Sequence, residues 1–410
     1  MKLDLTEMLY AMSYALDTIE NEVGGITTNH GKNVAYLCFL MGKEAGFSDA
    51  ELRDFVGISI LHDNAFSEYI REEYGDVARS GKIKLSKEDG SLDKYLLGYD
   101  HSLMGEKNIK LVPFRTNVKN VLLYHHENAN GSGAFHKDYK HTNLKSQIIH
   151  LADIIDVRWD IMHVDEASFE KIKEKVVSSK NIAFSEKSVD LFLKGVTFKN
   201  ILDIQKYTSI NCLKRDLRTV EEDYTDKEIK NLAKFFAQIV DYKSAFTKRH
   251  SIGVAEKCEK MAKFYKFPKE KATRFYLAGA LHDIGKLCVV NDILEKPNKL
   301  TPEEFDDIKE HVVETNKILC QVDGLEDICD WASHHHERLD GSGYPEGLTE
   351  DELTFEDKLL AEIDIYQALS EKRPYKDNIA HTECISIMRG MAAEGKIDKQ
   401  ILEDINKVMK

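Results

Sequence analysis

The sequence predicts an all-α fold made of two similar halves, and three observations support this. Apolar residues recur at helical spacing, strand-like alternation is hardly visible, and only 6 prolines interrupt the 410 residues. The third observation is that His and Asp residues recur in the same order in both halves. We therefore expect two domains, residues 1–210 and residues 220–410, with a seam near 200–222.

In the first half, the expected helices are separated by polar or glycine-containing breaks. Apolar positions at helical spacing run from Leu5 to Ile19, before a break at Gly24-Gly25. A helix is expected at 34–45, and apolar segments follow at 55–61 and 118–124. A further expected helix contains residues 148–153. Amphipathic helices are expected across 160–222, with one starting near Asp165. The segment 76–100 is rich in Gly, Lys and Asp, so we expect a loop there.

The composition is that of a soluble globular protein, with 42% hydrophobic and 31% charged residues. The 7 cysteines are scattered, odd in number and lack a C-x-x-C pair, which argues against a disulfide framework or a zinc ribbon and favours a reducing cytoplasm. The first residues lack the cationic and apolar blocks of a signal peptide, and no apolar stretch reaches 18 residues. We therefore expect a cytoplasmic protein with no membrane partner.

The net charge of −14 bears on ligands. A chain this acidic is not expected to carry the broad basic face that follows a nucleic-acid backbone, so bulk DNA and RNA are excluded as expected partners. A small phosphate ligand remains compatible with the charge, provided that metal ions or a few local cations attract it.

The duplicated pattern of His and Asp residues is the most specific feature of the sequence. His30 and His62 are 32 positions apart, as are His250 and His282, and a spacing of 25 likewise recurs. Among the matching intervals of the two halves, only the one from His62 to His101 differs much in length, and it contains the polar segment 76–100. The first set comprises His30, His62, Asp63, His101, His125, His126 and Asp153. The second set comprises His250, His282, Asp283, His311, His335, His336 and Asp364. Duplication of one metal-binding helical unit explains this recurrence.

The second set suits a pair of metal ions. Seven donors are too many for one closed structural zinc site, whereas two ions about 3.5–4 Å apart share a bridging carboxylate when they hydrolyse phosphate esters. Asp283 is the natural bridge, and ligation by N and O without thiolate favours Fe or Mn. Such ions would hold a bridging hydroxide that attacks phosphorus. Lys286, expected one helical turn beyond His282, and Arg373 could grip the phosphate.

A glycine turn follows the second His pair at Asp340-Gly341-Ser342-Gly343-Tyr344-Pro345. Its glycines allow the backbone to approach a ligand closely, and Tyr344 offers an aromatic surface for a base. A rigid turn between helices is an equally good interpretation of these residues alone.

Together, His282-Asp283-Ile284-Gly285-Lys286 and the stretch from His335 to Pro345 resemble the HD-GYP family, over roughly residues 225–380. The resemblance implies a helical bundle with two or three metals, usually iron or manganese. It further implies phosphodiesterase action on cyclic di-GMP or the mixed cyclic GMP-AMP. The metal ligands that it implies are His250, His282, Asp283, His311, His335, His336 and Asp364. It also implies phosphate contacts from Lys286 and Arg373, and a signature turn of Gly343, Tyr344 and Pro345.

Two positions depart from the family pattern. Family members with three metals carry a Glu four residues before the first His, where this chain has Phe246, so we expect two metals. A second Asp often follows the last ligand by three residues, where this chain has Gln367. His334 makes three histidines in a row, and we interpret it as a surface or supporting residue.

The first half resembles the family more weakly, because it keeps the ligand set but loses the phosphate contacts. Phe66 stands at the Lys position, Met162 at the Arg position, and the signature turn is Gly133-Ala134-Phe135. Residues 1–210 are therefore expected to form a degenerate HD-GYP-like domain that binds metal and turns over poorly. Two alternatives stay open: vestigial ligands that pair with one another, or a unit for packing and dimer contacts. His150 and His163 are interpreted as structural.

The function expected from all of this is hydrolysis of cyclic di-GMP or 3′3′-cyclic GMP-AMP to the linear dinucleotide by residues 220–410, and further hydrolysis to mononucleotides stays open. One alternative is an HD-type nucleotidase or phosphatase with another substrate. The other is a signalling adaptor that binds a cyclic dinucleotide without turnover. A homodimer is a further expectation.

Overall fold

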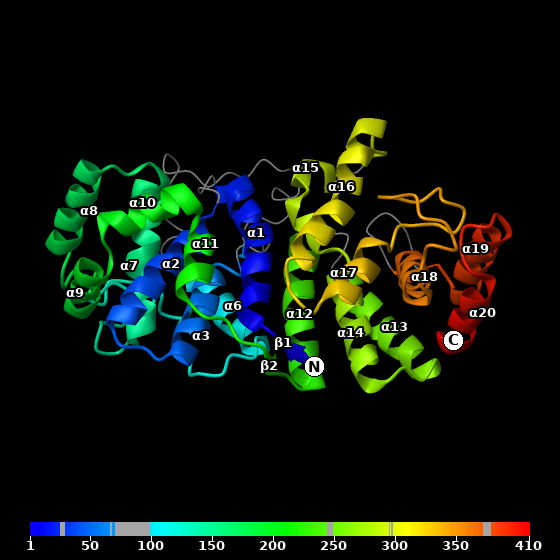
Figure 1. Cartoon of the computed structure of the whole chain (residues 1–410), viewed down its shortest axis with the longest axis horizontal. Coiled ribbons are helices and arrows are strands. Elements are labelled where there is room, and N and C mark those ends of the chain that lie inside the picture. Colours follow the sequence, from blue (N-terminus) through cyan, green and yellow to red (C-terminus); the bar gives the residue numbers. More distant parts are fainter. Residues whose placement is uncertain are drawn as a thin grey trace. The chain divides into compact units, whose positions relative to one another are not determined.

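The computed structural model describes residues 1–24, 29–65, 68–69, 99–243, 249–294, 296, 298–371 and 379–410. Helices make up both halves, and the chain divides into two compact units (Figure 1). The N-terminal unit lies between Asp4 and Glu221, and the C-terminal unit comprises Met1–Leu3 and Glu222–Lys410. The predicted all-α fold is confirmed, because the strands in the described residues are limited to two residues each.

In its described residues, the N-terminal unit is built from α-helices of moderate length and two 3-10 turns. Its elements are α1 (Leu5–Gly24), α2 (His30–Glu44), α3 (Asp49–Ile60), α6 (Tyr99–Asn108), η1 (Ile109–Leu111), α7 (Leu144–Trp159), η2 (Ile161–His163), α8 (Glu166–Ser178), α9 (Glu186–Gly195), α10 (Phe198–Tyr207) and α11 (Ser209–Asp216). Helix α2 packs against α3, α7 and α9, so it lies at the centre of this unit.

The C-terminal unit combines a short strand pair with a second helical bundle. Its elements are β1 (Lys2–Leu3), β2 (Glu222–Asp223), α12 (Asp226–Lys243), α13 (His250–Phe264), α14 (Lys269–Leu281), η4 (Ile284–Cys288), α15 (Asn291–Leu294), α16 (Pro302–Leu319), α17 (Glu326–Ser333), α18 (Phe355–Ser370), α19 (His381–Ala393) and α20 (Lys399–Val408). Helix α14 packs against α12, α13 and α17, and η4 packs against α16.

Capping residues fix where several functional helices begin. Ser48 caps α3, Thr301 caps α16 and Thr354 caps α18, each within a capping box. In such a box the N-cap hydroxyl and an acidic side chain three residues on satisfy two backbone N–H groups that the helix leaves unpaired. The boxes therefore set the register of α16, which carries His311, and of α18, which carries Asp364.

Several helix boundaries differ from the sequence-based expectation. Helix α2 begins at His30 rather than near residue 34, which makes this histidine its first residue. The loop expected at 76–100 lies outside the described residues except for Tyr99 and Asp100, which begin α6. The expected helix start near Asp165 is confirmed, because its carboxylate caps α8 by accepting the N–H of Ser168.

The cysteines also differ in part from expectation. The scattered spacing argued against disulfides, yet Cys320 and Cys329 are joined by one. Cys320 follows α16 and Cys329 lies in α17, and these two helices pack together, so a separation of nine residues brings the two cysteines within bonding reach. Among the described residues, no helix has the length and apolar character needed to cross a bilayer.

Candidate metal centre

The seven donors of the second half converge from five parts of the C-terminal unit. His250 is the first residue of α13, and His282 and Asp283 follow directly on α14. His311 lies in α16, the pair His335 and His336 follows α17, and Asp364 lies in α18. Most of these side chains are buried, so the helices deliver polar groups to an enclosed place.

The carboxylate of Asp283 lies between two groups of imidazoles. Its Oδ1 is 3.4 Å from Nε2 of His311 and 3.9 Å from Nε2 of His335. Its Oδ2 is 3.2 Å from Nε2 of His282 and 3.8 Å from Nε2 of His250. A carboxylate whose two oxygens face separate sets of donors is placed to bridge two cations.

Backbone carbonyls fix the tautomer of three of these histidines. Nδ1 of His282, His311 and His335 donates to the carbonyl three residues earlier, at 2.8, 2.5 and 2.6 Å. Because a carbonyl only accepts, the proton sits on Nδ1 and Nε2 keeps its lone pair, which is the ligand form of histidine. The three Nε2 atoms and Oδ1 of Asp283 have no hydrogen-bond partner among the described residues.

A bound metal ion would give these buried, unpaired acceptor atoms a partner. Burying unpaired acceptors costs roughly 1–3 kcal/mol each, and several such acceptors here point at one another. A cation is the one kind of partner that accepts lone pairs from imidazoles and a carboxylate together. The donor set therefore fits divalent metal ions.

The pKa values describe the same electrostatics. Burial lowers the pKa of His311 to about 4 and that of His336 to about 3, so both imidazoles are neutral at physiological pH. For His250, burial acts in the same direction, but hydrogen bonds to Asp364 (2.9 Å) and Glu371 (3.1 Å) outweigh it and raise the pKa to about 9. The carboxylates of Asp364 and Glu371 thus favour positive charge at this end of the cluster.

Lys286 adds a cation beside the bridge. Its Nζ is 2.6 Å from Oδ2 of Asp283. Helix α14 ends at Leu281 and Lys286 lies in η4, so a 3-10 turn rather than the expected continuous helix brings it there. Gly285 makes this possible, because a Cβ at that position would collide with the backbone carbonyl of His311.

The glycine turn closes over the same region. Glu337 is buried and accepts the backbone N–H groups of Glu346, Gly347 and Leu348, which holds the turn in shape. A Cβ on Gly343 would collide with the backbone of Glu337, so only glycine fits there. The ring of Tyr344 lies 4.8 Å from that of His336, between their centroids, which places the aromatic face beside the donors.

Comparisons with known proteins agree with this geometry. Residues 234–401 match the family model described as HD domain. The 3′3′-cGAMP-specific phosphodiesterase 1 of Vibrio cholerae is 27% identical over 98% of this chain and 91% of its own length. A cyclic di-GMP phosphodiesterase of Pseudomonas aeruginosa is 36% identical over 40% of this chain and 39% of its own length.

These matches bear out the resemblance to the HD-GYP family.

A solved structure supports the fold of this chain. It is the cyclic GMP-AMP specific phosphodiesterase of Vibrio cholerae called V-cGAP3, which aligns over 100% of this chain and 98% of its own with a TM-score of 0.65 and 22% identity. The likeness therefore extends through both units of the chain and concerns the fold.

The sequence missed two carboxylates that orient the first histidine of each set. In the C-terminal unit this partner is Glu371, and in the N-terminal unit it is Asp156, whose Oδ2 lies 2.7 Å from Nδ1 of His30. Asp156 follows Asp153 by three residues, which is the spacing of the second Asp noted for the family. That signal could have found Asp156, whereas none pointed to Glu371.

Three residues singled out in the sequence, Phe66, Phe246 and Arg373, lie outside the described residues. Met162 lies in η2 and is half-buried. His334 hydrogen-bonds Asp357 at 3.2 Å, which agrees with a supporting role. His163 is exposed and bonds Asp160 at 2.8 Å.

The first set of donors also converges, within the N-terminal unit. His30 begins α2, His62 and Asp63 follow α3, His101 lies in α6, His125 and His126 precede α7, and Asp153 lies in α7. Asp63, His101, His125 and His126 form one group of donors, and His30, His62 and Asp153 form another. His150 is buried near the ring of Phe184 and belongs to neither group.

Proposed function

We propose that the C-terminal unit is a metal-dependent phosphodiesterase that opens a bacterial cyclic dinucleotide to the linear form. The observation that carries this proposal is the set of buried, unpartnered donors arranged on both sides of Asp283. His250, His282, Asp283, His311, His335, His336 and Asp364 would hold two divalent ions, of Fe or Mn. Such ions would supply Lewis acidity for attack of water on phosphorus.

The side chains around this set supply binding and orientation. Lys286 places an ammonium group beside Asp283, where it can bind a phosphoryl oxygen as a point charge. Tyr344 offers an aromatic face for a base, and Nζ of Lys309 lies 5.8 Å from the centre of that ring. Arg373 is proposed as a second phosphate contact on the basis of its place in the sequence.

The names of the relatives guide the choice of substrate. The relative that aligns along nearly the whole chain is named for 3′3′-cGAMP, and the relative with the shorter match is named for cyclic di-GMP. We propose 3′3′-cGAMP as the first substrate to test and cyclic di-GMP as the second.

The test is turnover by the full chain, purified anaerobically and loaded with Fe(II) or Mn(II). We expect a linear dinucleotide from at least one of the two cyclic substrates. Hydrolysis of nucleoside monophosphates or triphosphates instead would favour a general nucleotidase. Binding of the cyclic dinucleotide with no product under any metal would favour an adaptor, and both results would overturn the proposal.

A matched pair of lysine variants tests the phosphate contact. Lys286→Gln should raise KM and leave the metal content unchanged, because it removes a point charge but none of the metal donors. Lys296→Gln removes a cation of the same unit that binds Glu304, and should leave KM unchanged. Equal KM values for the two variants would contradict the role of Lys286.

A further inference from the structure

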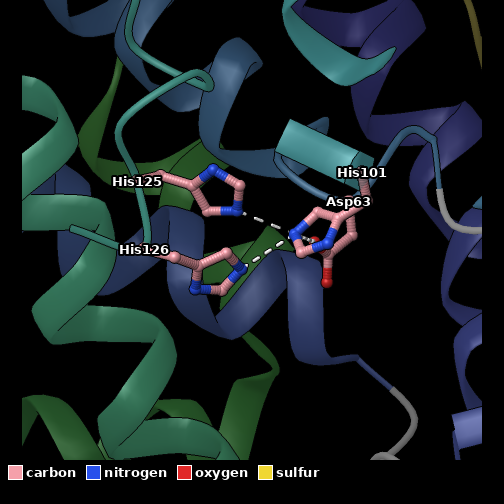
Figure 2. Close-up of side chains that lie close together, drawn as sticks. All are labelled: Asp63, His101, His125 and His126. Atoms are coloured by element: carbon pink, nitrogen blue, oxygen red, sulfur yellow. Dashed lines mark hydrogen bonds and ion pairs between the residues drawn. The ribbon is translucent and has the colours of Figure 1, made fainter. Parts of the chain in front are cut away.

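The N-terminal unit repeats the arrangement around the bridging carboxylate. Oδ1 of Asp63 is 3.8 Å from Nε2 of His101 and 3.9 Å from Nε2 of His125. Oδ2 of the same carboxylate is 3.6 Å from Nε2 of His62. As with Asp283, the two oxygens face different sets of donors. Figure 2 shows the rings of His125 and His126 turned towards His101 and Asp63.

The tautomers are fixed in the same way as in the C-terminal unit. Nδ1 of His62 donates to the carbonyl of Ser59 at 2.8 Å, and Nδ1 of His125 donates to the carbonyl of Leu122 at 2.5 Å. Nδ1 of His30 bonds the carboxylate of Asp156, which is how metal-bound histidines are commonly oriented. All three rings therefore present Nε2 to the interior of the unit.

The polar atoms presented there have no other partner. Nε2 of His30, His62 and His125, Oδ1 of Asp63 and Oδ2 of Asp153 lack a hydrogen-bond partner among the described residues. Their side chains are between 0 and 4% exposed, so bulk water does not satisfy them either. An unpartnered buried carboxylate is too costly to be maintained without a cation.

Direct pairing of histidines with carboxylates does not account for the cluster. Hydrogen bonds between N–H and O are about 2.7–3.2 Å long. The distances from Asp63 to its three imidazoles are 3.6, 3.8 and 3.9 Å, and Nδ1 of His126 lies 3.6 Å from Asp153. None of these imidazole–carboxylate distances falls within that range, although His101 and His126 hydrogen-bond each other through Nε2 at 2.9 Å.

The separations do suit ligands of a shared ion. Donors about 2.1 Å from a metal are roughly 3.0 Å apart when adjacent and roughly 4.2 Å apart when opposite. Nε2 of His126 and Nε2 of His101 are 2.9 Å apart, and the distances around Asp63 fall within the same range. The donor atoms of the cluster are therefore spaced as the ligands of metal ions at two neighbouring positions would be.

We propose that the N-terminal unit holds its own pair of divalent transition-metal ions. Asp63 would lie between them, with His101, His125 and His126 on one ion and His30, His62 and Asp153 on the other. Phe66 stands where the C-terminal unit has Lys286, so the site keeps metal donors and lacks that phosphate contact. Because its ligands come from α2, α6, α7 and the segments after α3 and before α7, the metal would tie these parts of the unit together.

The test counts metal ions per chain by mass spectrometry, on full-length protein loaded with Mn(II). We expect about four ions in the unaltered chain, two for each carboxylate bridge. His62→Ala combined with His125→Ala removes one donor from each group of the N-terminal unit and should leave about two. His282→Ala combined with His335→Ala is the matched change in the C-terminal unit and should also leave about two. His163→Ala, at a surface histidine, should change nothing.

Thermal unfolding gives a second readout that does not depend on activity. In the chain that carries His282→Ala and His335→Ala, a chelator should still lower the unfolding temperature of the N-terminal unit. Should His62→Ala with His125→Ala fail to fold, Asp63→Asn, which keeps the side-chain shape, carries the same expected loss. An equal metal count in the unaltered chain and in a folded N-terminal variant would overturn the proposal.

Discussion

The two metal-donor clusters agree in their donors and differ in the residues around them. Both place a carboxylate, Asp63 or Asp283, with one oxygen towards each group of imidazoles. In the C-terminal unit Lys286 bonds that carboxylate and Lys309 lies over the ring of Tyr344. The comparison teaches that the buried donors and the positive charges beside them are separable features, since the N-terminal unit keeps the donors and has Tyr99 at the position of Lys309.

The position of Lys309 illustrates this difference. It precedes His311 by two residues, and the matching residue of the N-terminal unit is Tyr99. Tyr99 stacks on Phe135, with 4.9 Å between the ring centroids, and Phe135 also contacts Tyr124. Uncharged aromatic residues thus occupy the position where the C-terminal unit has a lysine. The N-terminal unit therefore lacks the positive charge that would attract a phosphate at this position.

The largest expected effect comes from removing equivalent histidines of the two units. His282→Ala should lower turnover of the cyclic dinucleotide more than about 100-fold, because losing a metal ligand exceeds the 10–100-fold cost of losing a supporting group. His62→Ala should leave turnover within about threefold, since it acts outside the proposed catalytic unit. Steady-state kinetics with saturating metal measures both, and equal losses would break the assignment of roles.

The signature glycines should give the next largest effect. Gly343→Ala places a Cβ against three backbone atoms of Glu337 and Arg338, whereas Gly133→Ala places it 2.7 Å from the carboxylate and 2.9 Å from Cα of Glu127, so the overlap is smaller there. Overpacking costs about 1–3 kcal/mol, and we expect the upper end at Gly343 and the lower end at Gly133. Urea unfolding measures the change, and a larger loss from Gly133→Ala would show that the two turns do not pack alike.

A complementary pair of small residues offers a subtler comparison. Gly285 faces Thr315, whose hydroxyl joins its N–H to the carbonyl of His282 at 3.0 and 3.1 Å. The N-terminal unit has Ala65 at the position that matches Gly285 and Gly105 at the position that matches Thr315. Its glycine therefore lies on the opposite member of the pair. Gly285→Ala should lower turnover about tenfold by shifting Asp283, as a displaced supporting group does. Adding Thr315→Gly should recover none of that loss, because the added Cβ meets backbone atoms of His311 and Thr315. Recovery of turnover would show that the side chain of Thr315 causes the clash.

The smallest effect is expected at the carboxylate partners of the first histidines. Gln367→Asp should change turnover less than about threefold, because Glu371 already orients His250. Asp156→Asn should weaken metal binding to the N-terminal unit about tenfold, because it disturbs the partner of His30. Steady-state kinetics measures the first effect, and metal titration with a competing chelator measures the second. A change in turnover well above threefold from Gln367→Asp would contradict the role given to Glu371.

The sequence was sufficient to predict the helical fold and the residues that gather, because both follow from spacing along the chain. Helical periodicity marks a helix locally, and a repeated order of His and Asp marks a repeated site. The contacts of Glu371 with His250, and of Gly285 with the carbonyl of His311, arise only when distant segments meet. No local pattern encodes such contacts.

The same limit explains the remaining differences. Lys2 pairs with Asp223, so the first residues of the chain join the C-terminal unit. The two paired residues are separated in the sequence by the N-terminal unit. The Cys320–Cys329 disulfide depends on how α16 meets α17. Both are tertiary events between segments whose own sequences carry no matching signal.

The hydrogen bonds from imidazole Nδ1 atoms to backbone carbonyls have a consequence for metal uptake. Five imidazoles, from His62, His125, His282, His311 and His335, are anchored to the peptide carbonyl three positions upstream. Their orientation is thus set by the backbone before any ion arrives, so the apoprotein is preorganised and little entropy is lost on loading. An ion arriving at either cluster would therefore meet imidazoles that already present Nε2 and need no rotation of these five rings.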